Sequence, residues 1–177
     1  HGLGLLVHVD GARIGNAVAA LGGNPAQAIG DADIVSVGGT KNGMMFGDAV
    51  LVRRPELFDG IHFVQKQIGH LASKQRYVAA QFEAMFADDL WLSTAAHANA
   101  MAARLSEGMT ALGLRLASPV EANEVFVAMD PDLHRRLGDT YAVHQPDLGA
   151  PVVRFVCSWA TTDADVDGAL ATLRGLS

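Results

Sequence analysis

Residues 5–13 read Leu-Leu-Val-His-Val-Asp-Gly-Ala-Arg, and residues 34–43 read Ile-Val-Ser-Val-Gly-Gly-Thr-Lys-Asn-Gly. Each stretch opens with a mainly apolar run of strand length, which is typical of a buried β-strand. The first expected strand, residues 5–9, delivers Asp10 at its end. The second, residues 34–37, leads through two glycines to Lys41. The sequence therefore predicts two neighbouring strands that each end at a side chain able to do chemistry.

A carboxylate and a lysine at neighbouring strand ends are the groups that a pyridoxal phosphate (PLP) site needs. The lysine forms a Schiff base with the cofactor aldehyde, and the carboxylate keeps the pyridinium nitrogen protonated so that the ring can withdraw electrons. Each residue also has a simpler interpretation. Asp10 can be the N-cap of a following helix, and Lys41 can be a solvated surface charge. The pattern therefore indicates a candidate PLP site while both alternatives stay open.

The order of the expected elements indicates an α/β fold. A helix over residues 11–21 ends at Gly22, and a short helix follows with Asn24 as N-cap and Pro25 at its first position. Strands are expected at 33–37 and 49–52. Because apolar strands alternate with a helix, a mainly parallel sheet covered on both faces is predicted. Helices are then expected at 56–68, 74–86 and 88–112, and Gly113 ends the last of them.

The remainder of the chain has a different character and predicts a second, smaller α+β lobe. Strands are expected at 114–117, 124–129 and 152–157, with helices at 131–137 and 163–173. We therefore divide the chain into a first lobe at 1–87, a linking helix at 88–112 and a small C-terminal α+β domain at 113–177.

Composition excludes several classes of function. The net charge of −6 argues against a nucleic-acid surface, and the basic residues are too dispersed for a polybasic membrane contact. No apolar stretch approaches the roughly 20 residues that span a bilayer. The single cysteine, Cys157, allows no internal disulfide, is expected in the core and favours a cytoplasmic protein. No spacing of Cys and His indicates a metal site.

Two arginines are candidates for binding an anion. Arg13 would lie in the first turn of the helix that follows Asp10, where a cation opposes the helix dipole and so hints at an anionic partner. Arg154 lies within an apolar strand, where an unpaired guanidinium is costly and where its planar fork suits a carboxylate. A surface ion pair for Arg13 and an internal salt bridge for Arg154 are the alternatives.

The segments HVDGARIGNA (residues 8–17), DIVSVGGTKNG (33–43) and VVRFVCSWATTDADVD (152–167) occur in an order that resembles the low-specificity threonine aldolases, including the bacterial phenylserine aldolases. The resemblance covers essentially the whole chain. It implies a PLP-dependent transferase-like fold of the aspartate aminotransferase type. It also implies Lys41 as the Schiff-base lysine, Asp10 as the pyridinium partner, and Arg13 and Arg154 as clamps for the substrate carboxylate.

The same resemblance implies further site residues and an assembly. Thr40, Arg13 and Lys74 join the cofactor-binding set, and Lys66 joins the substrate-binding set. In relatives, basic residues near Lys66 and Lys74 lie close to the cofactor phosphate or reach the neighbouring subunit's site, although solvated surface lysines are the alternative. A homodimer or homotetramer with shared active sites is implied. Because family members carry a large segment before HVDGAR, the chain corresponds to their C-terminal portion, with residues 1–87 part of the PLP-binding domain.

The implied activity is cleavage of L-threonine, L-allo-threonine or related 3-hydroxy amino acids to glycine and an aldehyde. A PLP-dependent β-eliminating lyase or aminotransferase is the alternative within the class, and a catalytically incomplete fragment that acts only in subunit association is the alternative outside it. His8 is interpreted as a structural residue that faces away from Asp10. His70 is expected at the rim of the site and Asn123 in a turn. Gly2-Leu3-Gly4 does not indicate dinucleotide binding, since these glycines precede the strand.

Overall fold

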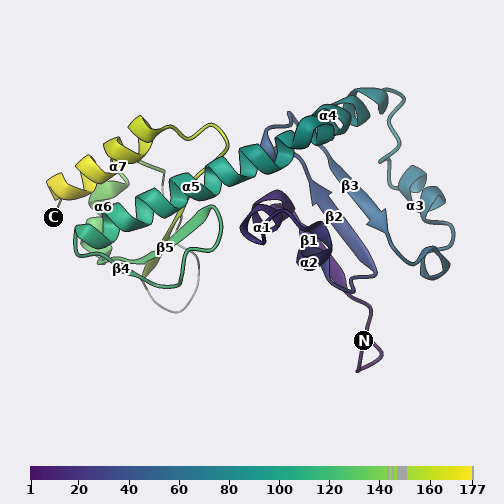
Figure 1. Ribbon diagram of the computed structural model, residues 1–177, viewed down its shortest axis with the longest axis horizontal. Coiled ribbons are helices and arrows are strands. Elements are labelled where there is room, and N and C mark those ends of the chain that lie inside the picture. The colour runs from purple at the N-terminus through teal and green to yellow at the C-terminus, as the bar shows by residue number, and fades with distance from the viewer. Residues whose placement is uncertain (143, 145, 147–150, 177) are drawn as a thin grey trace. The chain divides into compact units, whose positions relative to one another are not determined.

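The computed structural model describes residues 1–142, 144, 146 and 151–176, and divides into two compact units, His1–Thr94 and Ala95–Ser177 (Figure 1). Helix α5 (Leu90–Ala111) begins in the first unit and continues into the second. No helix in the described part of the chain is both long enough and apolar enough to cross a membrane.

The first unit contains a three-stranded sheet in the order β1-β2-β3, formed by His8–Gly11, Ile34–Gly38 and Asp48–Val52. Strands β1 and β2 are parallel, as predicted, and Asp10 lies opposite Ser36. Strand β3 runs antiparallel to β2, so the prediction of a mainly parallel sheet is wrong for this strand. Residues 39–47 connect the two strands, and so short a connection cannot provide the crossover that a parallel neighbour requires.

The start of β1 also differs from the prediction. The strand begins at His8, and Leu5, Leu6 and Val7 are exposed, so a buried strand over residues 5–9 is wrong. Only the last of these residues is held to the sheet. The Val7 carbonyl accepts the Asp33 N–H at 2.9 Å, and the Val7 N–H donates to Asp33 Oδ2 at 2.7 Å. The apolar run therefore enters the sheet at its end only.

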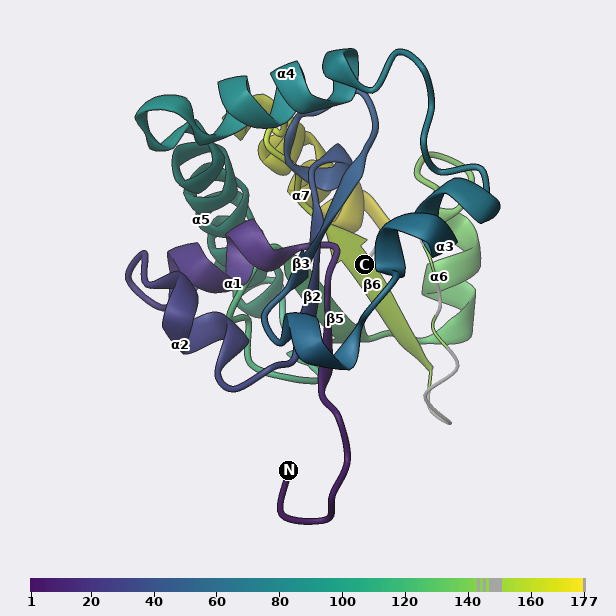
Figure 2. The same ribbon diagram turned by 90° about the vertical axis from the view of Figure 1, so that its right-hand side faces the viewer.

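One face of this sheet carries the core of the first unit. Val35 and Val37 of β2 pack with Ile14 and Val18 of α1 (Ile14–Ala20) and with Ala32. Figure 2 shows α1 and α2 (Pro25–Ile29) together on one side of β1 and β2. The predicted covering of both faces is wrong for the described residues, since His8, Asp10 and Val50 are exposed. The sheet therefore leaves the Asp10 face open.

Local chain signals account for the helices of the first unit. Asn24 caps α2 by accepting the Ala26 N–H, as predicted. The expected helix at 56–68 is instead a 3₁₀ turn, Pro55–Leu57, followed by α3 (Ile61–Gln67), because Gly60 adopts a left-handed conformation with φ +76° between them. Helix α4 (Arg76–Phe86) begins two residues after the predicted start.

The second unit is an antiparallel sheet covered by helices. Its strands are β4 (Arg115–Leu116), β5 (Glu124–Ala128) and β6 (Val152–Val156), in that order. Helix α6 (Pro131–Leu137) has the predicted bounds, with Asp130 as N-cap. Helix α7 (Asp163–Leu176) begins where Thr162 and Asp165 cap each other. The Thr162 N–H and then its hydroxyl, which both donate to Asp165 Oδ2, lower the pKa of Asp165. The core lies between the sheet and these helices, with members from β5, β6, α5, α6 and α7.

Cys157 lies in this core, as predicted, with 3% of its surface exposed. Burial raises the pKa of its thiol from 9.0 to about 11. The folded chain thus binds this proton more tightly than the unfolded chain. The stabilisation is complete below about pH 9 and is lost as the pH rises toward 11.

We therefore expect Cys157 to react slowly with iodoacetamide at pH 8 in the folded protein and rapidly in urea. The measurement is thiol labelling followed by mass spectrometry, with denaturation midpoints compared at pH 8 and pH 10.5. Equal labelling rates with and without urea would contradict the burial of the thiol.

Candidate functional site

Asp10 lies near the carboxyl end of β1, and its side chain is exposed. Its Oδ1 accepts the Ala12 N–H at 3.1 Å, so the carboxylate shapes the turn that leaves the strand. Helix α1 begins later, at Ile14, and Arg13 occupies its N-cap position with φ −131°. Asp10 as the helix N-cap is therefore wrong, and so is the placement of Arg13 in the first turn. The half-buried Arg13 side chain leaves the chain one residue before the helix.

Lys41 lies in a 3₁₀ turn, Thr40–Asn42, directly after β2. The turn is closed on itself because the N–H groups of Asn42 and Met44 both donate to the Gly39 carbonyl, at 2.9 and 3.1 Å. The Gly39 N–H donates to the Gly47 carbonyl at 3.1 Å, which closes the whole connection between β2 and β3. Thr40 and Lys41 are exposed on this turn. The Lys41 side chain is thus exposed, while the backbone of its turn is fixed by hydrogen bonds.

Gly38 packs the Lys41 turn against the Asp10 turn. A Cβ built on Gly38 would lie 2.9 Å from Ala12 Cα and 3.1 Å from the Ala12 carbonyl oxygen, so only glycine fits there. A Cβ on Gly39 would lie 2.0 Å from Met44 Sδ. Sequence reasoning expects these glycines to admit a ligand. In the structure they admit the chain's own backbone and a methionine side chain, and they bring the two predicted motifs to the same edge of the sheet.

His8 shares a sheet face with Asp10. Residues two apart on a strand point the same way, so the interpretation that His8 faces away from Asp10 is wrong. Its Nε2 lies 2.9 Å from Ser36 Oγ on the neighbouring strand. This hydrogen bond supports the structural role expected of His8.

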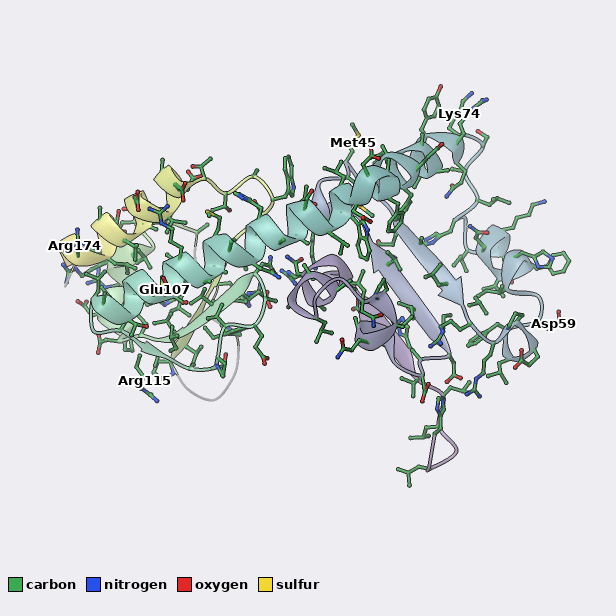
Figure 3. The ribbon with its side chains drawn as sticks, in the orientation of Figure 1. Met45, Asp59, Lys74, Glu107, Arg115 and Arg174 are labelled. Carbon is green, nitrogen blue, oxygen red and sulfur yellow. The ribbon has the colours of Figure 1, made fainter. Side chains whose placement is uncertain are left out.

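The other predicted basic residues of the first unit lie on its surface. Lys66 is in α3, and Lys74 lies just before α4, where it points outward (Figure 3). His70 follows α3, and its backbone carbonyl accepts a hydrogen bond from Gln65 Nε2 at 3.2 Å. No ion pair links either lysine to a carboxylate within the described residues. The structure therefore brings Asp10, Arg13, Thr40 and Lys41 to one sheet edge but does not join Lys66 or Lys74 to them.

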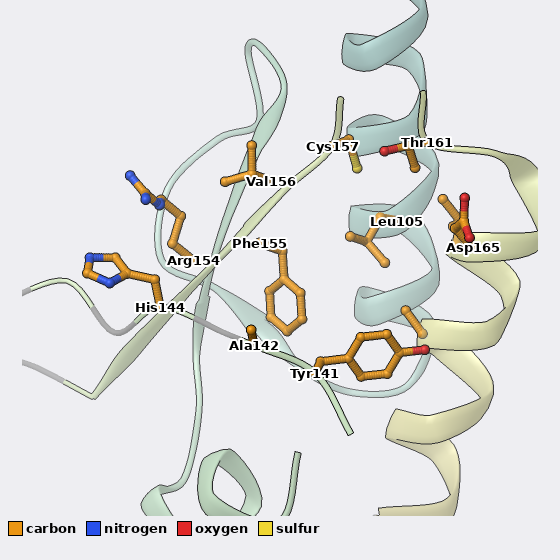
Figure 4. Close-up of a pocket in the computed structure, with 12 residues that line it drawn as sticks. Leu105, Tyr141, Ala142, His144, Arg154, Phe155, Val156, Cys157, Thr161 and Asp165 are labelled. Carbon is orange, nitrogen blue, oxygen red and sulfur yellow. The ribbon is translucent and has the colours of Figure 1, made fainter. Parts of the chain in front are cut away.

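Arg154 belongs to the second unit, on β6 opposite Phe126. Its Nη1 lies 3.4 Å from Glu124 Oε1, so the alternative of an internal ion pair is present in the structure. Figure 4 shows Arg154 and His144 on one side of β6, with Phe155 directed toward Leu105 and Tyr141 on the other. These residues line a hollow of about 380 Å³. Arg154 Nε is buried and has no acceptor among the described residues.

Two buried polar residues belong to the framework of this site and were missed by sequence reasoning. Asp33 precedes β2 and is fully buried, with Oδ1 2.9 Å from Arg54 Nε. Asn42 follows Lys41 and is 9% exposed. Asn123, expected in a turn, is also buried and donates from Nδ2 to the Cys157 carbonyl at 2.7 Å. The sequence offers one weak signal for Asp33 and Asn42: each is a polar residue next to a predicted feature, the apolar strand for Asp33 and the Lys41 turn for Asn42.

The residues at this edge fit PLP better than a metal. No group of three or more His, Cys, Asp or Glu side chains that could hold a metal ion is found within the part of the chain that the structure describes. Asp10 and Lys41 instead supply one carboxylate and one primary amine at adjacent strand ends. Close glycine packing of the turns behind them leaves both side chains exposed. A carboxylate for a ring nitrogen and an amine for an aldehyde are the donor set that PLP requires.

Curated relatives of the chain are threonine aldolases. It is 40% identical over 177 residues to the low-specificity L-threonine aldolase of Pseudomonas sp. (strain NCIMB 10558), covering 98% of this chain and 51% of the relative. The chain is also 41% identical over 162 residues to the enzyme of the same name from Pseudomonas aeruginosa, covering 90% of this chain and 47% of the relative. The chain thus spans about half the length of these relatives.

Solved structures agree with the fold. The structure of Leishmania major threonine aldolase matches with a TM-score of 0.87 and 29% identity, over 99% of this chain and 53% of that one. Sphingomonas wittichii serine palmitoyltransferase matches with a TM-score of 0.70 at 18% identity, over 98% and 47%, which shows the fold alone. The predicted α/β fold of the PLP-dependent transferase type is therefore confirmed. A family model described as beta-eliminating lyase matches residues 1–132, and the chain belongs to that family.

Proposed function

We propose that the protein to which these residues belong is a PLP-dependent aldehyde-lyase. Its reaction would cleave L-threonine, L-allo-threonine or a related 3-hydroxy amino acid to glycine and an aldehyde. The observation that carries this proposal is the 40% identity to a low-specificity L-threonine aldolase along 98% of the chain. The placement of Asp10 and Lys41 at one sheet edge supports it, because the relative's chemistry would need both groups there.

Each residue of the proposed site has a separate task. Lys41 would hold the cofactor aldehyde through Nζ, and Asp10 would keep a proton on the ring nitrogen through its exposed carboxylate. When bound, PLP would supply an electron-withdrawing ring that allows the bond between Cα and Cβ to break. Arg13 and Arg154 would orient the substrate α-carboxylate. Thr40 and Lys74 would help to bind the cofactor, and Lys66 would help to bind the substrate. A fixed carboxylate keeps the bond that breaks in one orientation.

The wider setting is part of the same proposal. We propose a cytoplasmic homodimer or homotetramer with shared active sites. Residues 1–87 would form part of the large cofactor-binding domain, residues 88–112 the linking helix and residues 113–177 the small C-terminal domain. The single buried cysteine is compatible with a reducing compartment.

Product analysis of the whole protein tests the proposed reaction. With threonine and PLP, the expected products are glycine and acetaldehyde in equal amounts. The description of the matching family favours β-elimination as the second candidate, which would release ammonia and a keto acid instead. Ammonia without glycine would overturn the aldolase assignment, and no turnover of any amino acid would favour a role in subunit association.

Replacing Asp10 with asparagine should lower kcat for threonine on the order of 10²-fold or more, while the fold is kept. Asparagine Oδ1 can still accept the Ala12 N–H, but it carries no charge to hold a proton on a ring nitrogen. Asp48→Asn, a change at another exposed carboxylate of the same sheet, is the matched control. Steady-state kinetics and circular dichroism measure the two effects. An Asp10→Asn variant as active as the control would remove Asp10 from the proposed site.

A further inference from the structure

Asn42 directly follows Lys41 and is buried, whereas Lys41 itself is exposed. The Asn42 side chain makes two hydrogen bonds to the first turn of α5. Its Nδ2 donates to the Trp91 carbonyl at 2.8 Å, and its Oδ1 accepts the Thr94 hydroxyl at 2.9 Å. Burying an amide without hydrogen-bond partners costs free energy. The two bonds therefore favour the observed side-chain position of Asn42 over buried positions that lack them.

The partner side of this contact is equally well fixed. The single Thr94 hydroxyl proton is shared between Asn42 Oδ1 and the Leu90 carbonyl oxygen, each 2.9 Å from Oγ1, so the hydroxyl is held by both Asn42 and its own helix. Trp91 packs against the core of the first unit, and Trp91 and Thr94 lie one turn apart on α5. The amide of Asn42 therefore binds a rigid surface.

The backbone before and after Asn42 is also held by contacts with other elements, and none of the contacts described below is made by the Lys41 side chain. Before it, Gly38 packs on Ala12. After it, Gly43 adopts φ +106°, and the Met45 N–H donates to Gln81 Oε1 of α4 at 2.9 Å. Asn42 is the attachment point adjacent to Lys41, so its amide fixes the direction in which the lysine leaves the turn.

We infer that Asn42 is a positioning residue for Lys41, holding the Lys41 backbone against α5 so that Nζ is directed to the Asp10 edge of the sheet. This inference rests on the proposed function, since it concerns how the lysine is presented to the cofactor aldehyde. Asn42 touches neither substrate nor cofactor in this scheme. Its effect passes through the turn alone.

The test compares labelling at the three lysines of the chain, Lys41, Lys66 and Lys74, in the whole protein. The protein is incubated with PLP, reduced with borohydride and mapped by mass spectrometry. Asn42→Ala should lower the rate of label at Lys41 about tenfold, since a small misplacement of a reacting group is enough for such a loss. Lys66 and Lys74 should keep their rates and serve as internal controls.

Changes at the partner residue make the test independent of one variant's folding. Thr94→Val removes the hydroxyl and should lower labelling at Lys41 in the same direction, whereas Thr94→Ser keeps the hydroxyl and should restore it. The melting temperature of each variant distinguishes a loss of Lys41 positioning from a general loss of stability. Unchanged labelling at Lys41 in Asn42→Ala and Thr94→Val, with only a lower melting temperature, would overturn the inference.

A second reagent distinguishes this inference from the proposed function. Acetic anhydride acylates any free amine, so its rate at Lys41 across pH 7 to 10 needs no PLP site. If PLP labels the three lysines of the unaltered protein equally, the proposed function fails. In that case a changed pH profile for acylation of Lys41 in Asn42→Ala still supports positioning, and an unchanged profile contradicts it.

Discussion

Replacing Lys41 with alanine is expected to lower kcat for threonine cleavage by at least about 10³-fold and to abolish borohydride-stabilised PLP on the protein. The proposed reaction depends on an amine that binds the cofactor aldehyde at the sheet edge that carries Asp10. Lys66 lies in α3 and Lys74 just before α4, and the sheet edge lies at the ends of β1 and β2. Neither lysine is therefore expected to replace Lys41.

Two matched variants, Lys66→Ala and Lys74→Ala, control for the loss of one surface charge. Both are expected to keep the label on Lys41 and to raise KM more than they lower kcat, since they are proposed to bind substrate or phosphate. Lys41 is exposed, so Lys41→Ala should leave the urea midpoint unchanged. Retention of label in Lys41→Ala, on either other lysine, would refute the assignment of Lys41.

Replacing Asp33 with alanine is expected to lower the free energy of unfolding of the first unit by about 1–3 kcal/mol. The Asp33 carboxylate is fully buried and meets the Arg54 guanidinium at 2.9 Å, the Val7 N–H at 2.7 Å and His1 Nε2 at 2.9 Å. Its removal leaves the part-buried Val7 N–H without its acceptor and releases the Arg54 guanidinium, whose side chain is 46% exposed, to solvent. The contacts tie the entry of β1 to β2 and to the chain beyond β3.

Tryptophan fluorescence can report this loss for the first unit alone. The chain has two tryptophans, and Trp91 packs against the core of the first unit while Trp159 lies in the second. In a Trp159→Phe background, urea denaturation followed through Trp91 should show a lower midpoint for Asp33→Ala. Asp31→Ala, a change at an exposed carboxylate two residues earlier, is the control and should stay within about 0.5 kcal/mol. Equal midpoints would mean that the Asp33 ion pair is not stabilising.

Local signals made much of the fold predictable. Asp130-Pro131 and the following Gly138 fix both ends of α6, and Asn24-Pro25 fixes the start of α2. Strand direction was not encoded in this way. The residues of β3 have the composition of a buried strand, and only the short connection from β2 makes the pair antiparallel. The exposure of Leu5 and Leu6 likewise depends on which surfaces are available to cover them, which an apolar pattern does not specify.

The residues of the candidate site also fall into those with a local sequence signal and those that depend on tertiary contacts. Asp10 and Lys41 were predictable because each lies at the carboxyl end of a strand, and parallel strands bring these ends to one edge. Asp33 and Asn42 were not, because their partners are distant in sequence: Arg54 for the first, and Trp91 and Thr94 for the second. The hydrogen bond between His8 and Ser36 also spans two strands. The residues proposed to act on the cofactor carry a local signature, whereas those proposed to hold them in place depend on tertiary contacts.

The mixed sheet of the first unit has a consequence for the order in which the chain folds. Strands β2 and β3 are close in sequence and pair antiparallel, from Gly38 with Asp48 outward, whereas β1 pairs with β2 across the intervening helices. Local pairing closes a smaller loop and is kinetically favoured. The hairpin that carries the lysine would thus form early and the aspartate strand would dock late. Substitutions in the hairpin should then slow folding, and substitutions in β1 should mainly accelerate unfolding.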